Sequence, residues 1–125
     1  MKNKTRIILS GEFITLNEYI NAERAHWARA ANFKKIETQR VAWEVIGQGI
    51  EKIEGRNHYT FTWYCKNRKK DPSNISFAVK FIFDGLEMAG AIENDGWKQI
   101  SGITHKFEVD KKEPRVEIDI TKSIV

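Results

Sequence analysis

Alternation of apolar and polar side chains between Tyr59 and Cys65 is the feature that most limits how this chain folds. Tyr59, Phe61, Trp63 and Cys65 occupy every second position of that segment. Because neighbouring side chains of a strand point to opposite faces, this pattern predicts a strand with one apolar face. The same alternation recurs in residues 115–120. Both segments are therefore expected to be strands.

Two helices are expected in the rest of the chain. Residues 21–48 lack proline and are rich in Ala, Glu, Arg and Lys, which favours one long helix. A second helix is predicted at about 74–88, capped by Ser73 or Asn74 and ended by Gly90. Its apolar positions follow the helical period: Ile75, Val79, Ile82 and Leu86.

Shorter segments complete the expected order of elements. Residues 6–9 read as a short strand, and residues 99–109 and 115–120 read as two more strands around a turn at 110–114. The full order is then β-α-β-α-β-β. This order indicates an α+β (mixed α/β) fold, with residues 1–125 forming a single domain.

The composition is that of a globular domain with a modest positive charge. The 125 residues are 41% hydrophobic and 30% charged, with a net charge of +4. Residues 1–70 carry 14 basic and 7 acidic side chains, whereas residues 71–125 carry 7 basic and 10 acidic ones. This asymmetry permits nucleic acid binding without requiring it. We find no long apolar segment and expect a cytoplasmic protein that makes no membrane contact.

The densest charge feature is the segment 66–70 (KNRKK), here called the basic loop, which runs directly into Asp71. One interpretation is a solvated loop whose Asp-Pro step starts the next helix. The other is a cradle for backbone phosphates beside a metal-binding acid. Lys34 and Lys35 indicate that the early part of the first helix is also either solvated or bound to an anion.

Further charged residues surround the second predicted helix. Lys80 and Asp84 lie one turn apart, and they form either a surface ion pair or part of a site where the lysine balances charge at a phosphoryl group. Asp95 belongs to an Asp-Gly step, which on its own is ordinary turn chemistry. Because Asp71 precedes the helix and Asp95 follows it, the two acids can meet at one edge and bind Mg²⁺ or Mn²⁺.

Three segments in this order resemble the RusA family of Holliday-junction resolvases, most closely its small prophage-borne members. They are Lys69–Ile75 (KKDPSNI), Lys80–Leu86 (KFIFDGL) and Ala91–Lys98 (AIENDGWK). The segment Gly11–Tyr19 (GEFITLNEY) is also similar to the opening of that family after its first strand. The likeness covers most of the chain.

The resemblance implies a homodimeric, metal-dependent endodeoxyribonuclease that resolves four-way DNA junctions by paired nicks in DNA recombination and repair. It implies catalytic roles for Asp71, Lys80 and Asp95, with Mg²⁺ or Mn²⁺ held by Asp71 and Asp95 and with Asp84 as a further candidate ligand. Branched DNA would be contacted by the following residues: Arg68, Lys69, Lys70, Asn74, Lys34 and Lys35.

One position departs from the family motif. The pattern Asp-x-Asp-Asn reads Asp71-Pro72-Ser73-Asn74 here, so Ser73 replaces the second acid. A neutral hydroxyl is a poor ligand for Mg²⁺. The chain can therefore use Asp84, Glu93 or a water as the missing ligand, cut weakly, or bind branched DNA without cutting. A small interaction module with a merely solvated basic loop is a third alternative.

The aromatic side chains outside the strands are expected to pack. We expect Trp27 and Trp43 to be core or dimer contacts rather than platforms for stacking bases. Phe77 and Phe81 are likewise expected to pack, with a wedge at the centre of a junction as the alternative.

Overall fold

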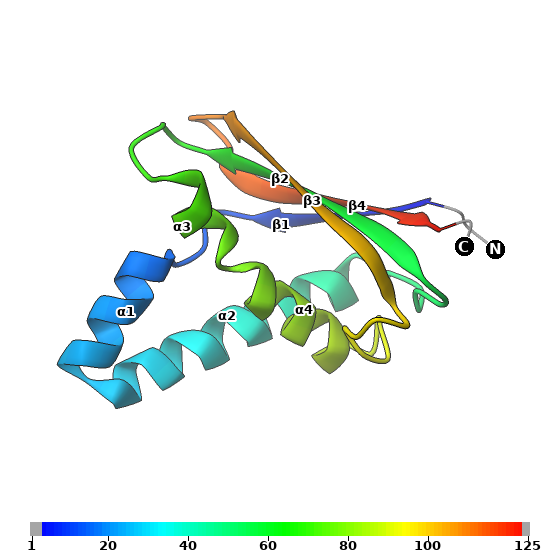
Figure 1. Cartoon of the computed structure of the whole chain (residues 1–125), viewed down its shortest axis with the longest axis horizontal. Coiled ribbons are helices and arrows are strands. Elements are labelled where there is room, and N and C mark those ends of the chain that lie inside the picture. Colours follow the sequence, from blue (N-terminus) through cyan, green and yellow to red (C-terminus); the bar gives the residue numbers. More distant parts are fainter. Residues whose placement is uncertain (1–3, 124–125) are drawn as a thin grey trace.

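The computed structural model describes residues 4–123, which form four strands and four helices (Figure 1). In chain order the elements are β1 (Lys4–Ser10), α1 (Leu16–Ala25), α2 (Trp27–Gly47), β2 (Asn57–Cys65), α3 (Pro72–Ser76), α4 (Val79–Met88), β3 (Ile100–Val109) and β4 (Arg115–Lys122). All the predicted strands are present, and each predicted helix is divided in two. The α+β class is confirmed.

The strands form one mixed sheet in the order β1-β4-β2-β3. β4 is antiparallel to both β1 and β2, whereas β2 and β3 are parallel. Parallel neighbours need a crossover connection, which α3 and α4 provide here. The register places Phe61 of β2 between Ile118 of β4 and His105 of β3. β1 and β3 are the two edges of the sheet.

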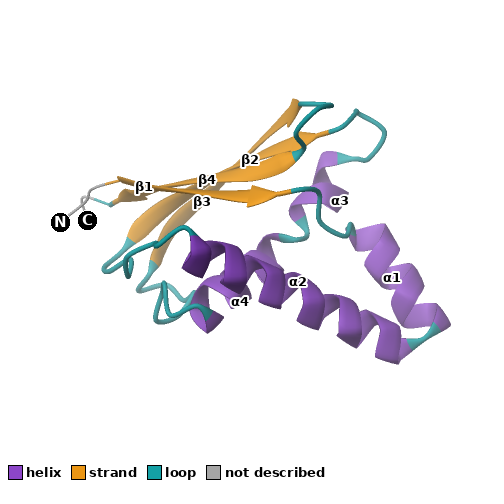
Figure 2. Cartoon of the chain, turned by 180° about the vertical axis from the view of Figure 1, so that it is seen from behind, coloured by secondary structure: helices purple, strands orange, loops and turns teal. Residues whose placement is uncertain are grey.

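The helices lie on one face of the sheet, and no helix of residues 4–123 covers the other face (Figures 1 and 2). The alternating strand residues therefore point their apolar side chains towards the helices. The largest fully buried side chains of the strands are Tyr59, Phe61, Ile7, Leu9, Ile118, Ile120 and Val116. The alternation in the sequence thus predicts the buried face of the sheet correctly.

The prediction of one helix over residues 21–48 is wrong. The first helix starts earlier, because Thr15 accepts the N–H of Glu18 and the Glu18 carboxylate accepts the N–H of Thr15 in a capping box. His26 then adopts an extended conformation (φ −167°, ψ 101°), and the chain turns from α1 into α2.

Within residues 4–123, neither α2 nor any other helix is long and apolar enough to span a membrane.

The second predicted helix, 74–88, is also two helices, and its predicted start is wrong. α3 begins at Pro72 with Asp71 in the N-cap position, so neither Ser73 nor Asn74 is the cap. The reason is local: the fixed φ of proline suits the first helical position, where its missing N–H costs nothing.

α4 packs tightly against α2 at Gly85. A Cβ atom at Gly85 would lie 2.5 Å from Cγ1 of Val41 and 2.9 Å from the carbonyl oxygen of Thr38. Val41 and Leu86 are both fully buried at this contact layer. The absence of a side chain at Gly85 therefore sets how closely α4 approaches α2.

Candidate functional site

Lys80 lies between two carboxylates. Its Nζ atom is 3.3 Å from Oδ1 of Asp84 and 3.4 Å from Oδ2 of Asp95. The Lys80 side chain is 60% exposed, whereas those of Asp84 and Asp95 are 21% and 23% exposed. These three residues form a charged group at the surface, which we call the Lys80 cluster.

α4 and the turn after it position the Lys80 cluster. Lys80 and Asp84 lie one helical turn apart in α4. Gly90, with φ +74°, ends the helix, and the N–H of Ala91 donates back to a carbonyl of α4. The chain thereby reverses direction, and the following segment brings Asp95 to the lysine.

The cluster keeps Lys80 charged and leaves an excess of negative charge. The hydrogen bond to Asp84 raises the pKa of the Lys80 ammonium, and the charge of Asp95 acts in the same direction. One ammonium faces two carboxylates, so the cluster can attract a further cation. Mg²⁺ is usually held by one or two carboxylates together with waters and substrate phosphates. The pair of carboxylates in the cluster is a donor set that fits this ion.

Asp71 forms no hydrogen bond or ion pair with the Lys80 cluster. Its main-chain carbonyl accepts the N–H groups of Asn74 (3.0 Å) and Ile75 (3.1 Å), as expected of an N-cap residue. Its side chain is exposed and has no hydrogen bond or ion pair with a described residue. Within residues 4–123, no three His, Cys, Asp or Glu side chains are grouped closely enough to hold a metal ion.

Ser73 and Asn74 follow Asp71 in the first turn of α3. Ser73 is exposed and Asn74 is half-buried. Neither side chain forms a hydrogen bond with another described residue. The start of α3 therefore presents one carboxylate, one hydroxyl and one amide that are available to a ligand.

The basic loop is anchored by two glutamates. The N–H of Lys66 donates to Oε2 of Glu12 at 2.8 Å. The Nζ atom of Lys70 lies 3.4 Å from Oε1 of Glu18 and 4.0 Å from Oε1 of Glu12. Lys70 therefore ties the loop to α1. The sequence interpretation missed both glutamates, because Glu12 lies 54 residues before Lys66 and no local pattern joins them.

Four other predicted phosphate-binding cations remain available to a ligand. Arg68 and Lys69 of the basic loop are exposed, as are Lys34 and Lys35 of α2. In the described part of the chain their side chains have no acidic partner. The basic loop and the first half of α2 lie towards the same end of the molecule (Figures 1 and 2).

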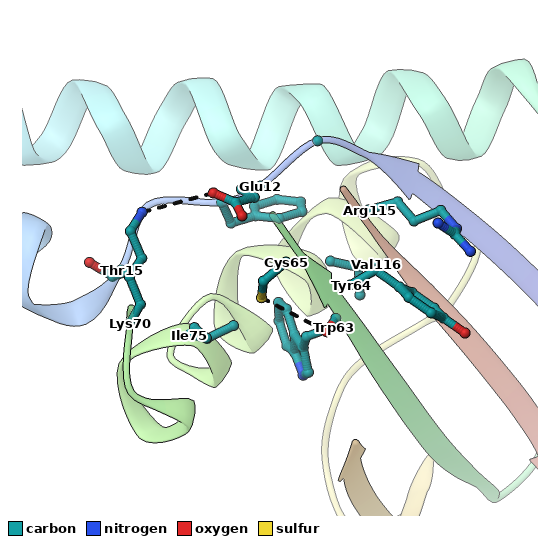
Figure 3. Close-up of a pocket in the computed structure, with 11 residues that line it drawn as sticks. Glu12, Thr15, Trp63, Tyr64, Cys65, Lys70, Ile75, Arg115 and Val116 are labelled. Atoms are coloured by element: carbon teal, nitrogen blue, oxygen red, sulfur yellow. Dashed lines mark hydrogen bonds and ion pairs between the residues drawn. The ribbon is translucent and has the colours of Figure 1, made fainter. Parts of the chain in front are cut away.

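A small cavity lies beside Lys70, between the sheet and α3 (Figure 3). Its walls include Glu12, Trp63, Cys65, Lys70 and Ile75. Its volume of about 20 Å³ has room for roughly one water molecule. Burial raises the pKa of the Cys65 thiol, so this cysteine stays protonated at neutral pH. The cavity is therefore too small and too unreactive to be the site of a reaction on DNA.

The structure corrects one expectation about the aromatic residues. Trp27 and Trp43 are 78% and 70% exposed, so the expectation that they pack in the core is wrong, and contact with a second copy stays a prediction. Phe81 is buried, and Phe77 packs against it in an edge-on arrangement. Trp97, two residues after Asp95, is 90% exposed, and no pattern in the sequence marks it as a surface residue.

Comparison of the whole chain with models of protein families gives no match, and a search of curated proteins also gives none. The resemblance to the RusA family therefore rests on short motifs alone, in the segments 11–19, 69–75, 80–86 and 91–98.

Proposed function

We propose that this chain is a metal-dependent endodeoxyribonuclease that resolves four-way DNA junctions, like the RusA family that its motifs resemble. The Lys80 cluster carries the proposal. Two motif segments that are separate in sequence supply a lysine and two acids that meet within 3.4 Å of Lys80 Nζ. The proposed setting is DNA recombination and repair in the cytoplasm.

The proposed ion is Mg²⁺, with Mn²⁺ as a substitute. Asp84 and Asp95 of the Lys80 cluster would hold it, together with waters and a phosphate of the DNA. When bound in such a site, a divalent ion lowers the pKa of water and neutralises charge on a phosphate. The exposed side chain of Asp71 has no partner among the described residues, but it is not grouped with Asp84 and Asp95 closely enough for the three to share an ion.

Lys80 would act on the scissile phosphate. Its ammonium stays charged because Asp84 accepts its hydrogen bond, and its side chain is 60% exposed and so accessible to DNA. A positioned cation stabilises the extra negative charge that a phosphodiester acquires during hydrolysis. The two carboxylates restrict where the ammonium can lie, so little reorganisation is needed when the phosphate arrives.

The DNA backbone would be held mainly by the exposed cations at one end of the molecule. Arg68, Lys69, Lys34 and Lys35 would contact phosphates, whereas Lys70 holds the basic loop in place through Glu18 and Glu12. Asn74 would add a polar contact from α3. Such contacts release counterions, so binding should weaken as salt rises.

The proposed nuclease acts as a dimer of two copies of this chain. A four-way junction has approximate two-fold symmetry, and a symmetric dimer offers one Lys80 cluster to each of two opposed strands. Paired nicks then follow from two equivalent sites.

A second candidate function is binding of branched DNA without cleavage. The observation that favours it is Ser73, which is exposed beside Asp71 where the family motif has an acid. Without that carboxylate, the start of α3 contributes only Asp71 to a metal site. The basic residues would still bind phosphates.

A single experiment separates the two candidates. The purified protein is incubated with a synthetic four-way junction, or with linear duplex of the same sequence, in Mg²⁺, in Mn²⁺ or in a chelator. Paired nicks that depend on the ion support the nuclease. Junction binding that persists in the chelator without nicks in either ion favours the binder, and S73D should then restore cleavage. Equal weak binding of junction and duplex would contradict both.

A further inference from the structure

The two edges of the sheet differ in how far the rest of the chain covers their main-chain hydrogen-bonding groups. At the β1 edge, side chains of α2 and of the residue after it, Gln48, form hydrogen bonds with the main chain. Gln48 accepts the N–H of Ile8 at 3.1 Å and donates to its carbonyl at 2.7 Å. Glu44 accepts the N–H of Ser10 at 3.0 Å, and Arg40 donates to the Ser10 carbonyl at 2.7 Å. α2 therefore blocks this edge against another strand.

The β3 edge has no such protection. In the described part of the chain, the main chain of residues 103–109 forms hydrogen bonds only with β2, so its outer edge is unpaired. This stretch contains no proline, and the only irregularity of the β2–β3 ladder lies at its beginning. An unprotected edge of this length is a template on which another strand can pair.

An apolar row accompanies the unpaired edge. Ile103, His105, Phe107 and Val109 share the face that points to the helices, because they pair with the buried row of β2. Ile103, Phe107 and Val109 remain 43%, 36% and 46% exposed, since the helices do not cover this edge. The apolar face of the sheet thus extends beyond the buried core to the solvent-exposed edge at β3.

We propose that β3 pairs in antiparallel fashion with β3 of a second copy of this chain, with the two-fold axis at Phe107. The charges of the strand favour this register. It places Lys106 opposite Glu108 of the second copy, twice by symmetry, and Phe107 opposite its own equivalent. A shift of the axis to Lys106 or to Glu108 would set like charges opposite each other. The pairing joins the two sheets into one of eight strands.

The inference extends the proposed function, since it supplies a surface for the second copy that junction cleavage requires. Its observations concern the sheet edge alone, and its test contains no DNA. Failure of the dimer would therefore leave the assignment of the Lys80 cluster to be judged separately by cleavage, and failure of cleavage would leave the dimer intact.

The first experiment exchanges the charges of the proposed interface. Sedimentation velocity over a range of concentrations should show a dimer for the wild type. K106E and E108K should each weaken it by about tenfold or more, because each places like charges opposite one another at two positions. The double variant K106E/E108K should restore wild-type association. K112E carries the same charge change in the turn beyond β3 and should leave the dimer unchanged.

The second experiment fixes the register. In a C65S background, F107C should form a disulfide-linked dimer on air oxidation, because directly opposed Cα atoms of antiparallel strands lie about 4.5–5.5 Å apart. I103C should not form one, since its two copies would be more than ~25 Å apart.

Four outcomes would each overturn the proposal: a wild type that stays monomeric, single charge variants that associate normally, a double variant that associates weakly, or cross-linking at residue 103 instead of residue 107. Pairing of β3 with a strand of another protein would appear as a monomeric wild type.

Discussion

At the scale of single residues, Lys80 and its neighbour Phe81 are expected to play different parts. Lys80 serves the proposed function, whereas Phe81 stabilises the fold. The Lys80 side chain is 60% exposed, and ion pairs at such positions contribute about 0–1 kcal/mol. We therefore expect K80M to change the free energy of unfolding by less than about 1 kcal/mol. Urea denaturation followed by circular dichroism measures this change.

The neighbouring residue provides the contrast. Phe81 is 3% exposed in the core, and F81A should cost roughly 3–5 kcal/mol. If K80M were as destabilising as F81A, Lys80 would be a structural residue, and its assignment to a site on DNA would be contradicted.

His105 should make stability depend on pH between about 7 and 5. Burial lowers the pKa of His105 below its ordinary value of 6.5, and its Nδ1 accepts the N–H of the Trp63 indole at 2.9 Å. As pH falls through about 6.5, the unfolded chain binds a proton that the folded chain resists. Stability is therefore full above that pH and should fall below it, by at most about 1.4 kcal/mol per pH unit.

The variant H105Q tests this cause. Its amide oxygen can accept the same hydrogen bond from Trp63 but does not titrate. The loss of stability between pH 7 and 5, measured by urea denaturation, should be smaller in H105Q than in the wild type. Equal losses in the two proteins would show that another group is responsible.

Contacts between charged residues show most clearly what can and cannot be predicted from the sequence. The contact of Lys80 with Asp84 is predictable, because helical residues one turn apart are neighbours. The contact of Lys70 with Glu18 is not, because it depends on how α1 packs against the chain 52 residues later. Trp43 could have been placed correctly, since it lies on the opposite side of the helix from Val41 and Val45, which are buried.

At the scale of elements, the contact between α2 and α4 depends on Gly85. In an exposed helix, replacing glycine by alanine stabilises by about 1 kcal/mol. At Gly85 we expect the opposite sign, a loss of roughly 1–3 kcal/mol, because the new Cβ would overlap Val41 and approach the Thr38 carbonyl. Thermal unfolding of G85A measures the effect.

Two further variants isolate the overlap. G47A, at the last residue of α2, meets no atom within 4 Å and should be neutral or slightly stabilising. Adding V41A to G85A removes the overlapping side chain, so the pair should cost less than the sum of the single variants. Additive losses would indicate that Gly85 is needed for a reason other than close packing.

The sequence predicts strands better than helix boundaries in this chain, for physical reasons. Alternation reports directly on which face is buried, and the core residues of β2 and β4 are those that the alternation selects. Helical propensity is judged over many residues together, so it does not predict a break caused by one extended residue such as His26. The division at this residue gives α1 its own direction, which allows Glu18 to reach Lys70.

At the scale of the whole molecule, the uneven charge of the chain should appear in the salt dependence of DNA binding. Removal of one cation that neutralises a phosphate reduces the slope of log K against log salt by about 0.9 on duplex DNA. We expect the double variant R68A/K69A to bind junctions more weakly and with a slope shallower by about 2. Fluorescence anisotropy at several salt concentrations measures both quantities.

The matched control is K111A/K112A, which removes two exposed lysines from the turn between β3 and β4. It has the same net charge as R68A/K69A. If both double variants changed the slope equally, general charge and not the basic loop would account for the binding.

The assignment of the Lys80 cluster is tested by the rate at which a four-way junction is cut under single-turnover conditions in Mg²⁺ or Mn²⁺. Wild-type protein should produce paired nicks, K112M should cut at the same rate, and K80M should bind the junction equally well but cut about 100-fold more slowly or worse. If the wild type made no nicks at saturating binding, or if K80M cut at the wild-type rate, the Lys80 cluster would not be the site of a junction nuclease.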